Sequence, residues 1–550
     1  RARPEVRQAM SSAPSSPQVL RIDALQVALP AGGDRGFAVD GVSLSIAAGQ
    51  TLCVVGESGS GKSVMATSVM GLLARELKVQ GGRIELNGES LLEASPTRLR
   101  DLRGKAMGMV FQEPMTALNP VMTCGDQVDE LLAEHTDWPA SQRRAEILRV
   151  FERVHLPDPE RMLRSFPHQL SGGQRQRIVI AMAVILKPAL IICDEPTTAL
   201  DVTTQKEILS LVEELQREQG SAVLFITHDM GVVSEIADQV IVMHQGRCVE
   251  SGTRDDVLVR PQADYTRMLL AAVPGMVPPA ARTIADTPPR LRGDALCKTY
   301  ISRDWMGRAR ETHALQDASL ALRGGETVGV VGESGSGKST FARCLIRLID
   351  PTAGKIFWDT DEVATRSESK LRPLRNRVQV VFQDPNRSLN PRRTVGQSIV
   401  EGAINFGMAP DAAHAMARKL MEQVRLPVEA LARYPSQFSG GQRQRLAIAR
   451  ALACQPEVLV ADEAVSALDV SVQAQILKLL REIQAELGLG LLFITHDLRV
   501  AAQLCDRVIV MRQGRIVEEG PTGPLYTQPA NDYTRRLLQS APGFAAHATG

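Results

Sequence analysis

The chain has 550 residues, 44% of them hydrophobic, which is enough for several domains with large buried cores. Its 63 basic and 62 acidic residues leave a net charge of +1, and only 4% of the residues are aromatic. This composition excludes a nucleic-acid-binding protein that depends on overall basicity, and it does not favour a base-stacking surface. We therefore expect no nucleic acid partner.

The chain begins with residues 1–17, which are rich in Ser, Pro and Arg and contain no apolar stretch typical of a signal peptide. We expect them to form a disordered tail. The longest apolar run, residues 178–186, is far shorter than the ~20 residues that a membrane span requires. The eight cysteines are scattered without a Cys-x-x-Cys pair, which indicates reduced structural thiols rather than a metal site.

The sequence repeats itself once. Residues 56–63 read GESGSGKS, and the same eight letters return at residues 332–339. Comparison of the two halves places one copy at residues 18–272 and the other at residues 291–546. Residues 273–290 are rich in Pro, which disfavours regular structure, so they are predicted to be a linker.

Each copy has the pattern of an α/β domain. In the first copy, strand-like segments at 42–46 and 82–86 come first, and a helical region that includes 140–153 follows. Three continuous apolar strands close the copy, at residues 190–193, 222–226 and 239–243. Such runs are typical of central parallel strands covered by helices on both faces. The predicted fold is a mostly parallel core sheet flanked by helices, with an antiparallel β subdomain and an inserted helical subdomain.

The repeated octapeptide matches the phosphate-binding loop pattern G-x-x-x-x-G-K-[ST]. A predicted strand, residues 51–55, precedes it, and a helix predicted for residues 62–73 follows it. Glycines let backbone N–H groups wrap around a polyphosphate, and the positive end of the helix adds to the attraction. A flexible Gly/Ser turn is the alternative, and two identical matches disfavour it.

The loop residues have separate expected roles. Lys62 and Lys338 can reach the β- and γ-phosphates, while Ser63 and Ser339 can offer a hydroxyl group to Mg²⁺. The residues predicted to contact the nucleotide are Gly56, Ser58, Gly59, Ser60, Gly61, Lys62, Ser63 and Val64, and Gly332, Ser334, Gly335, Ser336, Gly337, Lys338, Ser339 and Thr340.

A buried strand ends in two neighbouring acids in each copy, Asp194-Glu195 and Asp462-Glu463. An acid at the end of a core strand, beside a phosphate loop, suits Mg²⁺ held through its water shell, so Asp194 and Asp462 are predicted metal residues. The next acid is placed to polarise an attacking water, so Glu195 and Glu463 are the predicted general bases. Solvated acids at a strand end are the common alternative, and the nearby phosphate loops disfavour it.

The segment Ser-Gly-Gly-Gln opens an apolar helix in both copies. Its Ser and Gln fit a capping box, but two glycines weaken a helix start by nearly 1 kcal/mol each. They also bare N–H groups at the positive helix end, which favours a second phosphate contact. The residues expected to make it are Ser171, Gly172, Gly173, Gln174, Ser439, Gly440, Gly441 and Gln442.

His228 and His496 follow predicted strands in the two copies. An imidazole at this place could bond the γ-phosphate and sense its loss, so both are predicted catalytic residues. Gln112 and Gln383 also follow strands and could bind Mg²⁺ or the attacking water. A single His or Gln would be unremarkable, but the repetition in both copies favours function.

The order of phosphate loop, Gln, Ser-Gly-Gly-Gln, Asp-Glu, Ala-Leu-Asp and His resembles the nucleotide-binding domain of ABC transporters, twice, over nearly the whole chain. The resemblance implies two domains stacked head to tail, with each ATP between one copy's phosphate loop and the other's Ser-Gly-Gly-Gln helix. Lys62 would share a site with Ser439, and Lys338 with Ser171.

Three further features concern this resemblance. Asp201 and Asp469, in the Ala-Leu-Asp turns, would communicate between the domains. Tyr300 would stack on adenine in the second copy, whereas the matching residue in the first is Leu29, with Phe37 as a substitute. Weaker adenine stacking is therefore expected in the first copy. Some peptide-importer ATPases carry an iron–sulfur cluster after the domain, but the matching segments here lack cysteines, so we expect none.

A narrower resemblance follows each glutamine. Residues 112–120 read QEPMTALNP and residues 383–391 read QDPNRSLNP, and Tyr-Thr-Arg occurs at 265–267 and 533–535. These segments are similar to the ATPases of dipeptide and oligopeptide importers. The resemblance implies that the loops after Gln112 and Gln383 contact two integral membrane permease subunits. The alternative for each loop is a proline-bounded surface loop without a partner.

The resemblance implies an ATPase that uses ATP and Mg²⁺ and powers peptide import from the cytoplasmic face of the membrane, with a separate substrate-binding protein. ATP would close the two lobes, and hydrolysis would reset them. A soluble twin ATPase acting on ribosomes is the alternative, but such proteins usually have a longer, charged, helical linker. The cargo stays open, because glutathione, opines, sugars and metal chelates use similar ATPases.

Overall fold

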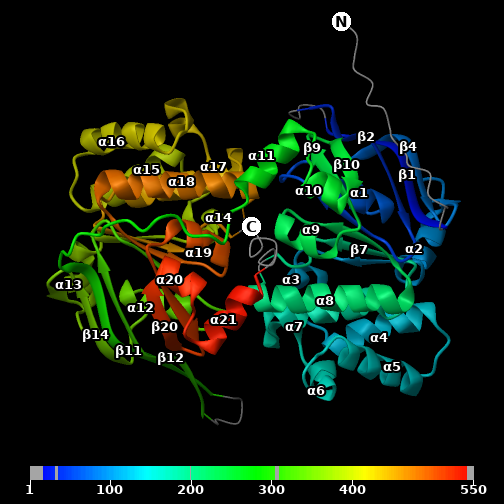
Figure 1. Ribbon diagram of the computed structural model, residues 1–550, viewed down its shortest axis with the longest axis horizontal. Coiled ribbons are helices and arrows are strands. Elements are labelled where there is room, and N and C mark those ends of the chain that lie inside the picture. Colours follow the sequence, from blue (N-terminus) through cyan, green and yellow to red (C-terminus); the bar gives the residue numbers. More distant parts are fainter. Residues whose placement is uncertain (1–16, 31–34, 199, 304–308, 467, 542–550) are drawn as a thin grey trace, which may run out of the picture. The chain divides into compact units, whose positions relative to one another are not determined.

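A computed structural model describes residues 17–30, 35–198, 200–303, 309–466 and 468–541. The tail predicted for residues 1–17 lies outside this part of the chain, apart from Pro17. The chain divides into two compact units, one of residues 1–198 and 207–270 and the other of residues 199–206 and 271–550 (Figure 1).

The first unit contains a six-stranded and a four-stranded sheet. The larger sheet has the order β10-β9-β3-β8-β7-β6, and all neighbouring strands are parallel except β9 and β10. Its strands are β3 (Thr51–Val55), β6 (Met107–Val110), β7 (Leu190–Asp194), β8 (Ala222–Ile226), β9 (Gln239–His244) and β10 (Arg247–Thr253). The antiparallel sheet has the order β2-β1-β4-β5 and consists of β1 (Gln18–Ala28), β2 (Phe37–Ala47), β4 (Lys78–Leu86) and β5 (Glu89–Ser90).

Helices of the first unit include a group inserted between β6 and β7. The group α4 (Cys124–His135), α5 (Ala140–Arg153) and α6 (Pro159–Arg164) is drawn in cyan in Figure 1. The other helices are α1 (Lys62–Val69), α2 (Pro96–Lys105), α3 (Pro114–Ala117), α7 (Gly172–Val184), α8 (Val202–Gln219), α9 (Met230–Ile236), α10 (Arg254–Leu258) and α11 (Asp264–Ala272). Residues 202–206 of α8 and residues 271–272 of α11 fall in the second unit.

The second unit repeats this plan. Its sheets have the orders β16-β17-β18-β13-β19-β20 and β12-β11-β14-β15. The strands are β11 (Pro289–Arg303), β12 (Ala309–Arg323), β13 (Thr327–Val331), β14 (Ala353–Trp358), β15 (Asp361–Glu362), β16 (Val378–Val381), β17 (Val458–Asp462), β18 (Gly490–Ile494), β19 (Arg507–Arg512) and β20 (Arg515–Pro521). The helices are α12 (Lys338–Leu345), α13 (Glu368–Leu371), α14 (Pro385–Ser388), α15 (Val395–Asn405), α16 (Pro410–Gln423), α17 (Gly440–Leu452), α18 (Val470–Leu487), α19 (Leu498–Leu504), α20 (Thr522–Thr527) and α21 (Asp532–Gln539).

The predicted fold class is confirmed: each unit has a mostly parallel core sheet, an antiparallel sheet and an inserted helical group. One predicted boundary is wrong. The helix predicted for residues 62–73 ends at Val69, because Gly71 adopts a φ of 61°, outside the right-handed helical region.

The Pro-rich segment between the copies packs along the second unit. Residues 273–288 form no helix or strand, and β11 begins at Pro289. The Arg282 guanidinium donates to both carboxylate oxygens of Asp506, at 2.9 and 2.7 Å. Gln503 donates its amide to two linker carbonyl groups, at 2.9 and 2.8 Å.

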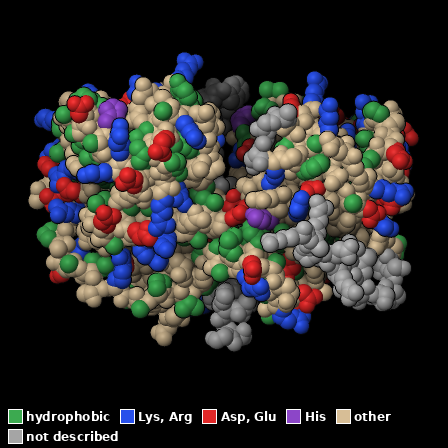
Figure 2. Space-filling model, turned by 90° about the horizontal axis from the view of Figure 1, so that it is seen from above, with side chains coloured by type: hydrophobic (Ala, Val, Ile, Leu, Met, Phe, Trp, Pro, Cys, Tyr) green, Lys and Arg blue, Asp and Glu red, His purple; other side chains and the backbone are tan. Residues whose placement is uncertain are grey.

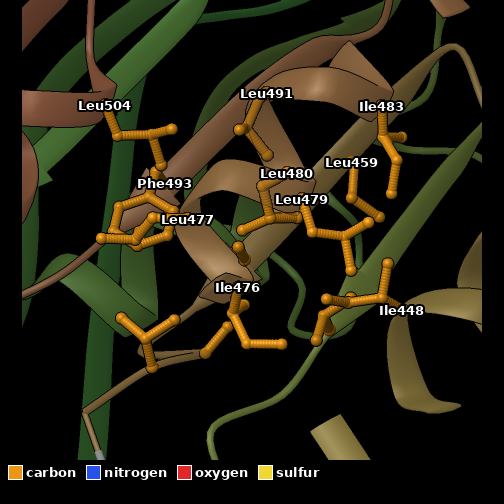
Figure 3. Close-up of a cluster of buried hydrophobic side chains, with 14 of the residues drawn as sticks. Ile448, Leu459, Ile476, Leu477, Leu479, Leu480, Ile483, Leu491, Phe493 and Leu504 are labelled. Atoms are coloured by element: carbon orange, nitrogen blue, oxygen red, sulfur yellow. The ribbon is translucent and has the colours of Figure 1, made fainter. Parts of the chain in front are cut away.

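Alternate side chains of the parallel strands pack into two different hydrophobic layers, one on each face of the sheet. In β17, Val458 and Val460 pack with α12 and the antiparallel sheet, whereas Leu459 and Ala461 pack with α17, α18 and α19. This alternation follows from the two-residue period of a strand, and it explains why strands covered on both faces are apolar throughout. Figure 3 shows the second layer, in which Ile476, Leu480 and Ile483 of α18 meet Leu459 and the strand β18.

Surface and thiol properties agree with the composition. Lys, Arg, Asp and Glu side chains are interspersed on the face shown in Figure 2. Among the described residues, no helix is long and apolar enough to cross a membrane. The eight cysteines are free thiols and six of them are buried; burial raises the pKa of Cys193 to about 12.

The helix α18 allows a matched test of this core. Leu480 is 1% exposed and Leu487, on the same helix, is 49% exposed. We expect Leu480→Ala to lower the stability of the second unit by about 2–5 kcal/mol, because it removes buried methyl groups and leaves a cavity. Leu487→Ala should stay within about 0.5 kcal/mol of the wild type. Urea unfolding of both variants measures this, and equal losses would contradict the assigned core.

Candidate functional site

Four predicted site segments follow four neighbouring strands of one sheet. The phosphate loop follows β3, His228 follows β8, Asp194 and Glu195 stand at the end of β7, and Gln112 follows β6. These strands are parallel, so their carboxyl ends meet at one edge of the sheet. The second unit repeats the arrangement with β13, β18, β17 and β16. The topology therefore brings the predicted residues together within each copy.

The phosphate loop requires glycine where it turns away from β3. Gly56 has a φ of 147°, and a Cβ atom there would lie 2.1 Å from the carbonyl oxygen of Met243. Gly61, which precedes α1, has a φ of 103°, and its Cβ would lie 2.3 Å from the carbonyl oxygen of Ala38. The loop thus fits tightly against β9 and β2, and it leads directly into a helix N-terminus, a natural site for phosphate.

The loop lysine is buried beneath this turn. Lys62 Nζ donates to the carbonyl oxygens of Gly56 and Glu57, at 2.7 and 3.0 Å. Lys338 makes the two equivalent bonds, both at 2.8 Å. Both lysines are 5% exposed, and burial lowers the pKa of Lys338. The carbonyl groups of the loop therefore position each ammonium group at the loop's centre.

A hydroxyl and a carboxylate meet beside each loop. Ser63 Oγ donates to Asp194 Oδ1 at 3.0 Å, and Ser339 Oγ donates to Asp462 Oδ1 at 3.1 Å. Burial raises the pKa of both aspartates, although the serine hydroxyls act in the opposite direction. A buried carboxylate next to a hydroxyl is an oxygen ligand set that fits Mg²⁺.

The neighbouring glutamate is held by three side chains. Glu195 Oε2 accepts from Gln112 Nε2 at 3.0 Å and from Thr198 Oγ1 at 3.1 Å, and it lies 3.3 Å from His228 Nδ1. Burial opposes ionisation of Glu195, but His228, Lys62 and Thr198 together outweigh it and lower the pKa of Glu195. A φ of 48° places Glu195 in the left-handed region, which is uncommon for a side chain of this size.

Glu463 repeats this arrangement with one difference. It has a φ of 51°, accepts from Gln383 Nε2 at 2.8 Å and lies 3.5 Å from His496 Nδ1. Burial again opposes ionisation, and the bond from His496 lowers the pKa of Glu463. Ser466, at the position of Thr198, donates to the backbone carbonyl of Glu463 at 3.1 Å instead of to its carboxylate.

The Ser-Gly-Gly-Gln segments begin α7 and α17 with the predicted capping boxes. Ser171 Oγ accepts from the Gln174 N–H at 3.3 Å, and Gln174 Oε1 accepts from the Ser171 N–H at 3.0 Å. Ser439 and Gln442 make the same pair of bonds at 3.3 and 3.0 Å. The capping prediction is confirmed, and both serines are exposed.

Other expectations stay predictions. They include the pairing of Lys62 with Ser439 and of Lys338 with Ser171, and the communication roles of the two Ala-Leu-Asp aspartates. Tyr300 on β11 is 41% exposed, with Lys298 Nζ 5.2 Å from its ring centroid. In the first copy, Leu29 and Phe37 are half-buried on either side of the β1–β2 turn.

Two kinds of contact do not follow from the motifs in the sequence. The phenol oxygen of Tyr265 accepts from the N–H of Glu57 in the phosphate loop at 3.4 Å, and Tyr533 does the same for Glu333 at 3.3 Å. The Tyr-Thr-Arg segment, repeated at residues 265–267 and 533–535, is the sequence signal for this contact, but it does not indicate the phosphate loop as the partner.

A second missed contact distinguishes the copies. Arg343 Nη2 lies 3.7 Å from Asp462 Oδ2. The equivalent residue of the first copy is Thr67, whose hydroxyl donates to the carbonyl oxygen of Ser63 at 2.8 Å. Nothing in the motif itself predicts this difference.

Comparisons with known proteins agree with this geometry. A family model described as ABC transporter matches residues 39–198 and 315–466. A second model, described as Oligopeptide/dipeptide transporter, C-terminal region, matches residues 249–307 and 517–549.

Two curated relatives and one solved structure illustrate the similarity. The chain is 44% identical to the glutathione import ATP-binding protein GsiA of Shigella dysenteriae serotype 1 (strain Sd197), over 95% of this chain and 89% of the relative. The protein of the same name from Escherichia coli (strain K12) gives the same three values. A dimeric post-hydrolysis state of the ATP-binding cassette MJ0796 bound to ADP and Pi is 29% identical, with a TM-score of 0.39, and the match covers 42% of this chain and 98% of that chain.

These comparisons give no support to a ribosome-associated ATPase. Both halves of the chain match the transporter model, and the C-terminal model belongs to peptide transporters. The chain therefore belongs to the ABC transporter family, as an ATP-binding protein in which each of two copies carries the C-terminal region of oligopeptide and dipeptide transporters.

Proposed function

We propose that this chain is the subunit that binds and hydrolyses ATP to power an importer for peptides. One observation carries the proposal. In each copy, three features lie at the same edge of the core sheet: a phosphate loop, a serine–aspartate pair, and a glutamate held by His and Gln. The match to the peptide transporters' C-terminal region supports the peptide cargo, and the name of the relatives supports import.

The phosphate loop supplies the binding energy for the nucleotide. Its N–H groups and the N-terminus of α1 would surround the phosphates, and Lys62 would exchange its loop carbonyls for phosphate oxygens. Ser63, Asp194 and Gln112 would hold Mg²⁺, and the second copy offers Ser339, Asp462 and Gln383. The ion, when bound, would neutralise part of the phosphate charge.

Glu195 and Glu463 would act as general bases. The pKa of each is lowered, so each carboxylate is ionised at neutral pH and can accept a proton from an attacking water. His228 and His496, whose Nδ1 atoms lie 3.3 and 3.5 Å from these carboxylates, would orient them. Replacing both glutamates tests these roles directly by kinetics.

We expect Glu195→Gln combined with Glu463→Gln to reduce the ATPase rate by about 10²–10⁴-fold, because an amide cannot accept the proton. ATP binding should survive, since the amide keeps the size of the side chain. The measurements are steady-state phosphate release and titration with a fluorescent ATP analogue.

Glu93→Gln combined with Glu362→Gln is the matched control, because both of these carboxylates are exposed on the chain's surface. This control should hydrolyse ATP at the wild-type rate. Near-normal hydrolysis by the first double variant would refute the assignment of the bases.

The two copies should differ in adenine binding. Stacking on an aromatic ring contributes about 1–3 kcal/mol per base, and Tyr300 has Leu29 at its counterpart position. A Lys62→Ala chain, which keeps the second phosphate loop, should therefore bind ATP at least about fivefold more tightly than a Lys338→Ala chain. Adding Tyr300→Leu to the Lys62→Ala chain should remove the difference. Equal ATP affinities of the Lys62→Ala and Lys338→Ala chains would contradict weaker adenine stacking in the first copy.

The loops after the two glutamines are proposed to contact the permease subunits. In the first copy, Met115 of α3 and Val121 are 46% and 79% exposed, so this loop offers apolar contacts. In the second copy, the exposed residues Arg392 and Arg393 replace Val121 and Met122. The two loops thus suit partner surfaces of different chemistry, one apolar and one acidic.

We expect the chain to co-purify from detergent with two multispanning subunits rather than with ribosomal particles. Val121→Asp should weaken that association while ATP binding stays unchanged, because a charge replaces an exposed apolar contact. Val259→Asp is the matched control, since Val259 is 73% exposed directly after α10. Equal retention of both subunits by both variants would contradict the docking role of the loop.

The location and cargo complete the proposal. We place the chain peripherally on the cytoplasmic face of the cell membrane, with a separate substrate-binding protein that delivers cargo. Because the relatives are named for glutathione import, small peptides of this kind are the first cargo to test. Ligand screening of the partner binding protein would decide between glutathione and other cargo.

A further inference from the structure

A tyrosine of the C-terminal region touches the phosphate loop in each copy. Tyr265 lies near the start of α11 and Tyr533 near the start of α21, about two hundred residues after the loops that they contact. Each phenol oxygen accepts the N–H of the loop's second residue, at 3.4 Å for Glu57 and 3.3 Å for Glu333. The contact occurs in both compact units, which argues against a chance contact.

The tyrosine and the loop lysine bind the two polar groups of a single peptide unit, at its opposite edges. The N–H of Glu57 and the carbonyl group of Gly56 belong to the same peptide unit, and in a trans peptide they point in opposite directions. Tyr265 binds the N–H, while Lys62 donates to the carbonyl oxygen at 2.7 Å. If Lys62 turns to phosphate, the tyrosine still holds this peptide.

The tyrosines are themselves fixed by residues on the β9–β10 and β19–β20 hairpins. The Tyr265 ring stacks on His244 at 4.0 Å, and Arg512 lies 4.8 Å from the centroid of the Tyr533 ring. These neighbours directly follow Met243 and Met511, whose carbonyl oxygens crowd the first glycine of each loop. One hairpin therefore supports both the loop and its tyrosine.

A carboxylate on the same hairpin also holds the entry to the tyrosine's helix. Glu250 on β10 accepts the backbone N–H groups of Gln262 and Ala263, at 2.6 and 3.1 Å. Glu518 on β20 does the same for Ala530 and Asn531, at 2.8 and 3.1 Å. These bonds fix where α11 and α21 begin, and hence where each phenol oxygen lies.

We propose that Tyr265 and Tyr533 are positioning residues for nucleotide binding, and that through them the C-terminal region sets the nucleotide affinity of its own copy. Each phenol fixes the first peptide of the loop in the orientation that the phosphate-binding turn requires, so that less ordering is needed when the nucleotide binds. This inference rests on the proposed function, because it assumes that the loops bind ATP.

The test replaces each tyrosine by phenylalanine in full-length chains that keep one competent loop. In a Lys338→Ala chain, Tyr265→Phe should weaken binding of trinitrophenyl-ATP by about two- to tenfold, the usual effect of one neutral hydrogen bond. Tyr533→Phe should leave the affinity of that chain unchanged. In a Lys62→Ala chain the two substitutions should exchange their effects.

Tyr526→Phe is the matched control for a purely structural effect. Tyr526 is 8% exposed and donates its hydroxyl to the carbonyl oxygen of Leu498 at 2.7 Å, so its loss also removes a buried phenol hydrogen bond. We expect a lower nucleotide-free melting temperature and an unchanged affinity for the analogue.

If the wild-type chain binds the analogue, two outcomes would overturn this inference without affecting the proposed function. One is an unchanged affinity in both Tyr265→Phe and Tyr533→Phe. The other is a loss of affinity in Tyr526→Phe as large as in those two variants. A wild-type chain that does not bind the analogue would overturn the proposed function and this inference with it.

Discussion

In each copy, burial raises the pKa of two neighbouring acids at the end of one strand, but their polar partners leave the two acids with net pKa shifts in opposite directions. Asp194 keeps a raised pKa because the hydroxyl of Ser63 compensates for only part of its desolvation. Glu195 turns into the left-handed region and meets His228, whose hydrogen bond lowers its pKa. The strain of such a residue, on the order of 1–2 kcal/mol, is typical of functional sites. Two adjacent carboxylates thereby have pKa values shifted in opposite directions, which agrees with the different roles proposed for them.

The meeting of these groups could be predicted from the sequence because strand topology determines it. Asp194 ends β7 and His228 follows β8, and neighbouring parallel strands bring such residues to one edge. Thr198 could not be assigned in this way, since its bond depends on the turn after Glu195 rather than on a strand. The Tyr265 contact also depends on how a helix docks, which no local pattern of residues encodes.

The duplication preserves the reacting groups but changes the residues around them. Arg343 places a positive charge 3.7 Å from Asp462, whereas Thr67 binds backbone at the same position of the first copy. This guanidinium is about half exposed, so solvent screens much of its effect. The second difference is also small: the Thr198 hydroxyl donates to the carboxylate of Glu195, whereas the Ser466 hydroxyl donates to the backbone carbonyl of Glu463. Such changes leave the serine–aspartate pair and the glutamate with its His and Gln neighbours in place in both copies.

The C-terminal region contacts the phosphate loop directly, although separate family models describe the two. The β9–β10 hairpin supplies the carbonyl group that crowds Gly56, the ring that stacks on Tyr265 and the carboxylate that fixes the start of α11. A change in that hairpin or helix would reach the loop through one peptide unit, because Tyr265 and Lys62 hold its two sides. The positioning role proposed for Tyr265 therefore depends on residues that lie outside the phosphate-binding motif.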